Sequence, residues 1–148
     1  MIKLPSKTIF YSIEKAIKKY RKFAQKNIDK EVGKITLDQG LALIFLNHFP
    51  DLPQNEIAEL IFKDNASLTR MIELMSKKAL LKREVNPSDR RRFKLKVTDD
   101  GMDVLENLSD VIASNRTTAL KGISEEEIQQ VEEVLNKIIT NCENSKIH

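Results

Sequence analysis

A basic hairpin that directly follows two short helices limits the folds that this chain can adopt. Residues 80–86 and 93–98 are predicted as two short strands, and the alternation of apolar and polar side chains is clearest in Phe93, Leu95 and Val97. Residues 87–92, Pro-Ser-Asp-Arg-Arg-Arg, join these strands as a turn. Three adjacent arginines repel one another unless a polyanion or a carboxylate lies close to them. This order of elements predicts a helix-turn-helix followed by a wing.

The two helices before the hairpin have the expected lengths and polarity. Pro53 suits a first helical turn, so a helix is predicted over residues 54–62. Asp64 and Asn65 are both good N-cap residues, and they predict a second helix that ends near residue 78. This second helix has one apolar face, and its other face carries short polar residues and an arginine. It is therefore the candidate recognition helix.

Amphipathic helices flank this central region on both sides. Apolar residues recur at helical spacing over residues 6–31, 36–48, 98–121 and 124–142. Thr36 with Gln39, and Ser124 with Glu127, form capping boxes at two of the helix starts. The first helix and the last two hold more apolar surface than one small core can cover. We therefore expect them to bury it against a second copy of the chain.

Length and composition predict one mainly α (α+β) domain over residues 1–148. The chain has only four Gly and four Pro among 148 residues, which favours long helices. The predicted winged helix-turn-helix spans about residues 36–98, with dimerisation helices at about 6–31 and 99–142. No segment approaches the about 18–20 apolar residues that cross a bilayer, so we expect a cytoplasmic protein without a membrane partner.

Several kinds of chemistry are excluded by the residues present. One cysteine, Cys142, and two histidines cannot make an internal disulfide, and they leave too few ligands for a structural zinc site. The sequence has no glycine-rich phosphate loop, no paired histidines on one helix face and no convincing nucleophile beside a base. We expect no enzyme activity, no cofactor and no metal.

The net charge of +3 conceals a strong asymmetry along the chain. Residues 1–49 carry 10 Lys/Arg against 4 Asp/Glu, and residues 70–97 carry 10 against 3. Residues 98–148 carry 4 against 11, so the last helix is acidic. Clustered basic segments are compatible with a nucleic-acid partner, although a lysine-rich helix face is more often simply solvated.

Two groups of residues are candidates for contact with duplex DNA, which requires polar side chains in the major groove and cations at the phosphates. In the recognition helix they are Asn65, Ser67, Thr69 and Arg70. In the wing they are Asp89, Arg90, Arg91 and Arg92, where Asp89 is expected to hold Arg91. The alternative for the first group is that Asn65 and Ser67 only cap the helix and Arg70 is a solvated charge.

These motifs together resemble the MarR family of winged helix-turn-helix transcription regulators. The resemblance lies in Asp64-Asn-Ala-Ser-Leu-Thr-Arg70, Leu80-Leu-Lys-Arg83, the wing Asn86-Pro-Ser-Asp-Arg-Arg91 and Thr98-Asp-Asp-Gly101. It extends to Ile35–Gln39 and Ile123–Glu127 at two helix starts. It implies a homodimer on a pseudo-palindromic DNA operator, with phosphate contacts from Gln54 and Asn55. It also implies a repressor that a small aromatic or anionic effector releases.

Three residues depart from the family pattern. Ala79 replaces a glycine after the recognition helix, so we expect that helix to end without a left-handed glycine cap. Leu74 occupies a position that is commonly polar, and Ala66 one that is commonly hydroxylated.

The remaining candidates for a functional role are one cysteine, one histidine and several aromatic residues, each of which could instead belong to the core. Cys142 is interpreted as a buried structural thiol rather than a redox sensor. His48 is interpreted as a core or pocket histidine rather than a metal ligand. Tyr11, Tyr20, Phe45 and His48 are candidates for an effector pocket, although their spacing fits core packing better.

The rival hypothesis is a winged-helix dimer that binds another protein. Its basic face would then serve an acidic partner, and the wing arginines would not need to act together. DNA binding instead predicts a strong dependence on salt.

Overall fold

The computed structural model describes residues 1–145, and the side chain of Arg92 is outside the described part. The elements are η1 (Pro5–Lys7), α1 (Ile9–Glu31), α2 (Leu37–His48), α3 (Gln54–Leu60), α4 (Asn65–Lys77), β1 (Leu81–Asn86), β2 (Asp89–Val97), α5 (Asp99–Ala119) and α6 (Glu125–Asn144). Every predicted helix is present, with bounds that agree to within a turn. The chain divides into two compact units, Met1–Asn115 and Arg116–His148.

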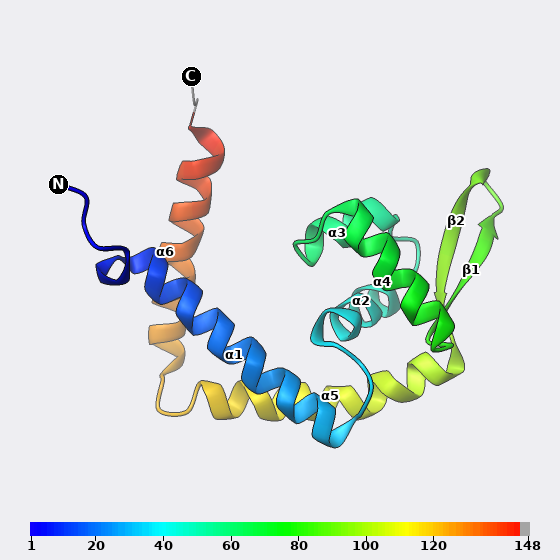
Figure 1. Cartoon of the computed structure of the whole chain (residues 1–148), viewed down its shortest axis with the longest axis horizontal. Helices are drawn as coiled ribbons and strands as arrows, with labels where there is room; N and C mark the ends of the chain where they lie inside the picture. The colour runs from blue at the N-terminus through cyan, green and yellow to red at the C-terminus, as the bar shows by residue number, and fades with distance from the viewer. Residues whose placement is uncertain (146–148) are drawn as a thin grey trace. The chain divides into compact units, whose positions relative to one another are not determined.

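The first unit is built around one apolar core, to which helices α1 to α5 and the base of the hairpin contribute (Figure 1). The largest fully buried side chains are Ile28, Leu43, Ile57, Leu68, Ile72, Met75, Leu81 and Leu108. Burying one such side chain stabilises a fold by about 1.5–3 kcal/mol. The core therefore fixes α3 and α4 against α2, and the mainly α fold is a winged helix-turn-helix.

The wing is a two-stranded antiparallel hairpin of β1 and β2. Val85 pairs with Phe93 and the next pair is Asn86 with Asp89, so residues 90–92 fall between these pairs as extra residues of β2. We predicted residues 87–92 as the connecting turn, whereas the turn is only Pro-Ser. It is shorter because Asn86 Oδ1 accepts a hydrogen bond from the N–H of Ser88 at 2.9 Å, which closes the turn early.

Thr98 fastens the hairpin to the elements on either side of it. Its hydroxyl donates to the carbonyl of Ala79 and accepts from the N–H of Gly101 at 3.0 Å. Its own N–H donates to the carbonyl of Leu80 at 3.1 Å. A Cβ on Gly101 would collide with that same Leu80 carbonyl. The Thr-Asp-Asp-Gly motif is thus explained by the close approach of α5 to the corner between α4 and β1.

Helix α4 ends on a left-handed residue that is not glycine. Ala79 has a φ of +60°. Its N–H donates to the carbonyl of Ser76 and the N–H of Leu80 to the carbonyl of Met75, both at 3.0 Å, which is a Schellman motif. We expected no left-handed glycine cap, but the left-handed turn is present and is made by alanine.

The outer helices leave much apolar surface uncovered. Helix α1 buries only Ala24 and Ile28, and α6 buries no residue. The exposed apolar residues of these regions include Ile9, Phe10, Tyr11, Ile17, Val131, Val134 and Ile139. Cys142 is exposed, so its interpretation as a buried thiol is wrong for the single chain. Within the described residues, no helix combines the length and the apolar character needed to cross a membrane.

Candidate nucleic-acid interface

Helix α4 has one buried and one solvent-facing side, as a recognition helix requires. Its buried side chains are Leu68, Met71, Ile72 and Met75. Of the residues predicted to read DNA, Asn65 and Arg70 are exposed, and Ser67 and Thr69 are half-buried. Leu74 is 52% exposed on the same helix. The four predicted residues thus occupy the first two turns of α4 and reach its accessible surface.

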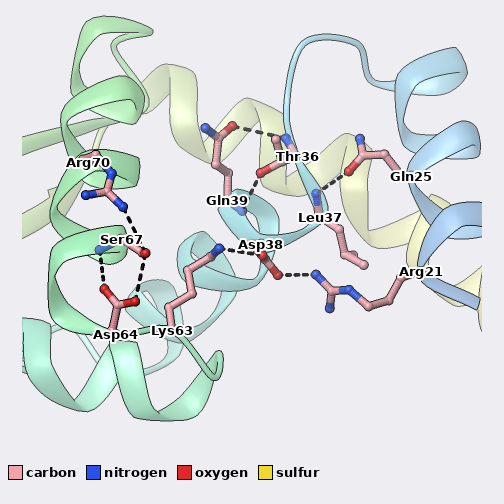
Figure 2. Close-up of polar contacts among 10 residues, drawn as sticks. All are labelled: Arg21, Gln25, Thr36, Leu37, Asp38, Gln39, Lys63, Asp64, Ser67 and Arg70. Carbon is pink, nitrogen blue, oxygen red and sulfur yellow. Dashed lines mark hydrogen bonds and ion pairs between the residues drawn. The ribbon is translucent and has the colours of Figure 1, made fainter. Parts of the chain in front are cut away.

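A hydrogen-bond network orders the first turn of α4 (Figure 2). Asp64 is the N-cap and accepts from the N–H of Ser67 at 2.7 Å and from its hydroxyl at 3.1 Å. Arg70 Nη2 in turn donates to Ser67 Oγ at 3.2 Å. The two hydrogen bonds from Ser67, assisted by the charge of Arg70, hold the pKa of Asp64 below its ordinary value of 3.8. Asp64 therefore stays ionised and positions both Ser67 and Arg70.

Gln54 and Thr69, predicted in separate roles, contact each other. Gln54 Nε2 donates to Thr69 Oγ1 at 2.9 Å, and this hydroxyl donates to the carbonyl of Asn65 at 2.8 Å. The contact ties the first residue of α3 to the second turn of α4. Asn55 is exposed beside Gln54. The start of α3 and the accessible face of α4 therefore form one continuous polar surface.

The wing presents its arginines to solvent. Arg90 and Arg91 are exposed, and the side chain of Arg92 is outside the described residues. Asp89 Oδ1 accepts a hydrogen bond from the backbone N–H of Arg91 at 3.0 Å, which orders the chain at the start of β2. At the base of the wing, Lys94 Nζ lies 2.9 Å from Asp51 Oδ1 in the loop between α2 and α3.

The turn between α3 and α4 also has a left-handed residue, Phe62, with a φ of +60°. Its N–H donates to the carbonyl of Glu59 at 3.2 Å, and the N–H of Lys63 donates to the carbonyl of Ala58 at 2.9 Å. The Phe62 side chain is 96% exposed. Backbone hydrogen bonds, rather than side-chain burial, hold this turn in its strained conformation.

Sequence reasoning missed a partly buried ion-pair network that joins α1, α2 and the turn before α4. Asp38 of α2 lies 2.5 Å from Arg21 Nη2 of α1 and 3.1 Å from Lys63 Nζ (Figure 2). Partial burial disfavours the charged carboxylate, but hydrogen bonds from Arg21 and Lys63 and their positive charges outweigh it. They lower the pKa of Asp38 below its ordinary value of 3.8. No local sequence pattern predicts these contacts, because the three residues come from separate parts of the chain.

The residues predicted for an effector pocket lie in different environments. Tyr20 and Phe45 are half-buried, whereas Tyr11 and His48 are exposed. The interpretation of His48 as a core histidine is therefore wrong; its ring makes an edge contact with Phe49 at 5.0 Å. A shallow groove along α1 includes Tyr11 together with lysines of the same helix. The described residues contain no cluster of three or more His, Cys, Asp or Glu that could hold a metal.

Comparison with known proteins gives a consistent result. Residues 34–92 match the family model described as the MarR family. A Staphylococcus aureus MepR–DNA complex is similar, at 24% identity over 90% of this chain and 98% of that one, with a TM-score of 0.81. The structure of Bordetella bronchiseptica BpsR is also similar, at 18% identity over 99% of this chain and 100% of that one, with a TM-score of 0.83. Apo MarR from E. coli is 20% identical, with 88% and 96% coverage and a TM-score of 0.72. At these identities the structural matches establish the shared fold.

Proposed function

Residues 34–92 match the MarR family model, and from this match we propose that the chain is a sequence-specific regulator of transcription that binds double-stranded DNA. One observation carries the proposal: the polar face of α4 is accessible and continuous with the start of α3, and exposed arginines extend from the wing that follows α4. This arrangement offers side chains for a major groove and cations for the backbone or minor groove. The MepR structure, a complex with DNA, supports the same use of the fold.

We propose that the functional form is a homodimer on a pseudo-palindromic operator. The support is the exposed apolar side chains on both α1 and α6, because such faces in a regulator of this fold are expected to be covered by a second copy of the chain. A two-fold dimer would place one recognition helix on each half-site, about 34–36 Å apart. Burial in the dimer would also protect Cys142, which follows the apolar seam of α6.

We further propose that the chain is a repressor that a small aromatic or anionic effector releases. BpsR supports this, because its DNA binding is described as regulated by 6-hydroxynicotinic acid. An effector acts only through different affinities for the DNA-binding and non-binding shapes of the dimer. Tyr11, Tyr20, Phe45 and His48 remain the proposed effector contacts, with Tyr20 and Phe45 the more enclosed pair.

The proposed function is tested by selecting genomic DNA fragments with the purified chain at two salt concentrations and sequencing them. We expect an inverted repeat to be enriched, with an affinity that falls steeply as salt rises. Arg70→Ala and Arg91→Ala should each weaken binding to this repeat, because their side chains are exposed on the proposed surface. Arg116→Ala, which removes an exposed arginine from α5, is the matched control and should bind as the wild type does.

Two outcomes would contradict the proposal. Failure of the wild type to enrich any sequence at low salt would favour the rival function, binding of an acidic protein partner. Survival of full operator affinity in both Arg70→Ala and Arg91→Ala would show that the contact surface lies elsewhere.

A further inference from the structure

Two lysines that flank helix α4, Lys63 before its N-cap and the C-cap residue Lys78, are bonded to one short segment, residues 34–39, which leads from α1 into α2 and which we call the junction segment. At the N-terminal end of α4, Lys63 Nζ lies 3.1 Å from Asp38 Oδ2. At the C-terminal end, Lys78 Nζ donates to the carbonyl of Lys34 at 2.8 Å. The same ammonium also donates to the side-chain oxygen of the glutamine in the α2 capping box. The recognition helix is therefore held at two points to a segment outside α3 and α4.

The junction segment is in turn bonded to α1. Gln25 Nε2 donates to the carbonyl of Ile35 at 3.0 Å, and Gln25 Oε1 accepts from the N–H of Leu37 at 2.7 Å. One turn earlier, Arg21 is paired with Asp38 at 2.5 Å. The Asp38 carboxylate is thus shared by a cation of α1 and a cation at the start of α4 (Figure 2).

The burial of this bridge makes it more than a surface ion pair. The side chains of Asp38 and Lys63 are only 21% and 28% exposed. Leaving one partner of a desolvated pair without the other is costly, so the bridge favours a single arrangement of the three groups. Lys63 also has little backbone freedom, because its N–H closes the left-handed turn after α3 and the next residue is the N-cap of α4.

Resting on the proposed operator binding, we propose that Asp38, Lys63 and Lys78 are positioning residues that fix the angle between α4 and α1. They would contribute through geometry, without reading bases. In a dimer joined through α1, this angle determines the distance between the two recognition helices. It therefore determines which spacing of half-sites the dimer accepts.

The key variant is Asp38→Asn, because loss of positioning and loss of a negative charge predict opposite changes in its affinity for DNA. The change keeps the side-chain shape and removes one negative charge, so charge alone would strengthen binding to any DNA. Loss of positioning instead weakens binding to the preferred spacing. Glu14→Gln is the matched control, since it removes one charge from an exposed α1 ion pair with Lys18 that makes no contact with the junction segment.

The experiment uses synthetic duplexes carrying the half-sites that the wild type selects, with the spacer shortened or lengthened by one or two base pairs. Asp38→Asn is expected to lose about 3- to 10-fold of the affinity for the preferred spacing and to discriminate less between spacings. Glu14→Gln is expected to keep the wild-type preference. Far-UV circular dichroism at the binding temperature verifies that each variant is folded.

Lys78→Met gives an independent test, and Lys77→Met, a change at the neighbouring lysine, is its control. This pair replaces Asp38→Asn if that variant unfolds. A lysine that only contacts phosphate weakens binding equally at all spacings, whereas a positioning lysine changes the preference. Wild-type spacing preference in Lys78→Met and in every folded Asp38→Asn sample would overturn the proposal. Failure of the wild type to select an inverted repeat would instead refute the proposed function.

Discussion

Replacing Ala79 by glycine is expected to stabilise the fold by about 0.5–1 kcal/mol. Ala79 is exposed, ends α4 and has a φ of +60°. A left-handed conformation costs a residue with a Cβ about 1–2 kcal/mol. Glycine avoids this cost but loses about 0.4–1 kcal/mol more backbone entropy on folding. The hydrogen bonds around the turn use backbone groups and the Thr98 hydroxyl, so they survive the change.

Urea unfolding followed by circular dichroism measures this difference. The midpoint should rise without a change in slope, and the melting temperature should rise by about 1–4 °C. Ala16→Gly makes the same chemical change inside α1 and should lower stability by about 0.5–1 kcal/mol. An equal loss of stability in Ala79→Gly and Ala16→Gly would refute the argument that Ala79 is strained.

Two further predictions concern single contacts. Gly101→Ala should lower the free energy of unfolding by about 1–3 kcal/mol, because its Cβ would collide with the carbonyl of Leu80; unchanged stability in urea would refute this. Asp38→Asn should lower stability by about 1–2 kcal/mol at pH 7, where the Asp38 carboxylate is ionised and paired. Since the folded pKa of Asp38 lies below 3.8, the difference from wild type should persist above pH 5 and disappear as the pH falls through that folded pKa. Urea melts at pH 7, 5 and 3 measure the difference, and a difference that grows on acidification contradicts the reasoning.

Local features of the fold were predictable because short-range chemistry determines them. The capping boxes at Thr36 and Ser124 form as the residue types indicated, with both reciprocal hydrogen bonds. Asp64 caps α4 for the same reason. Both strands of the wing were predicted, the second from its alternating pattern, although the Asn86 turn moved the start of β2 to Asp89.

Left-handed helix ends were harder to predict because glycine is the usual signal for them. Phe62 and Ala79 both adopt φ +60° without that signal. In each case backbone hydrogen bonds of the ending helix favour the left-handed turn. The residue that follows Ala79, Leu80, is buried in the core, and the residue that follows Phe62, Lys63, is paired with Asp38, so tertiary structure overrides the local preference.

The sequence predicted which side chains of the candidate site are exposed, but not the contacts that join them to other elements. The side chains of Asn65 and Arg70 are accessible as expected, because helical periodicity separates a buried from an open face. The contacts of Gln54 with Thr69 and of Asp38 with Lys63 join residues from different elements. Such pairs depend on how helices pack, which the one-dimensional pattern of a single sequence does not specify.

These internal contacts reduce the number of cations that are free to neutralise DNA phosphates. Residues 70–97 contain ten cations by sequence, yet Lys78 is bonded to the junction segment and Lys94 is paired with Asp51. Salt dependence counts only the cations that neutralise phosphates, at a slope of about −0.9 for each one. Lysines that hold the recognition helix and the wing in place contribute orientation rather than counterion release. The slope should therefore follow the exposed arginines of α4 and the wing, and the basic composition of the segment overstates it.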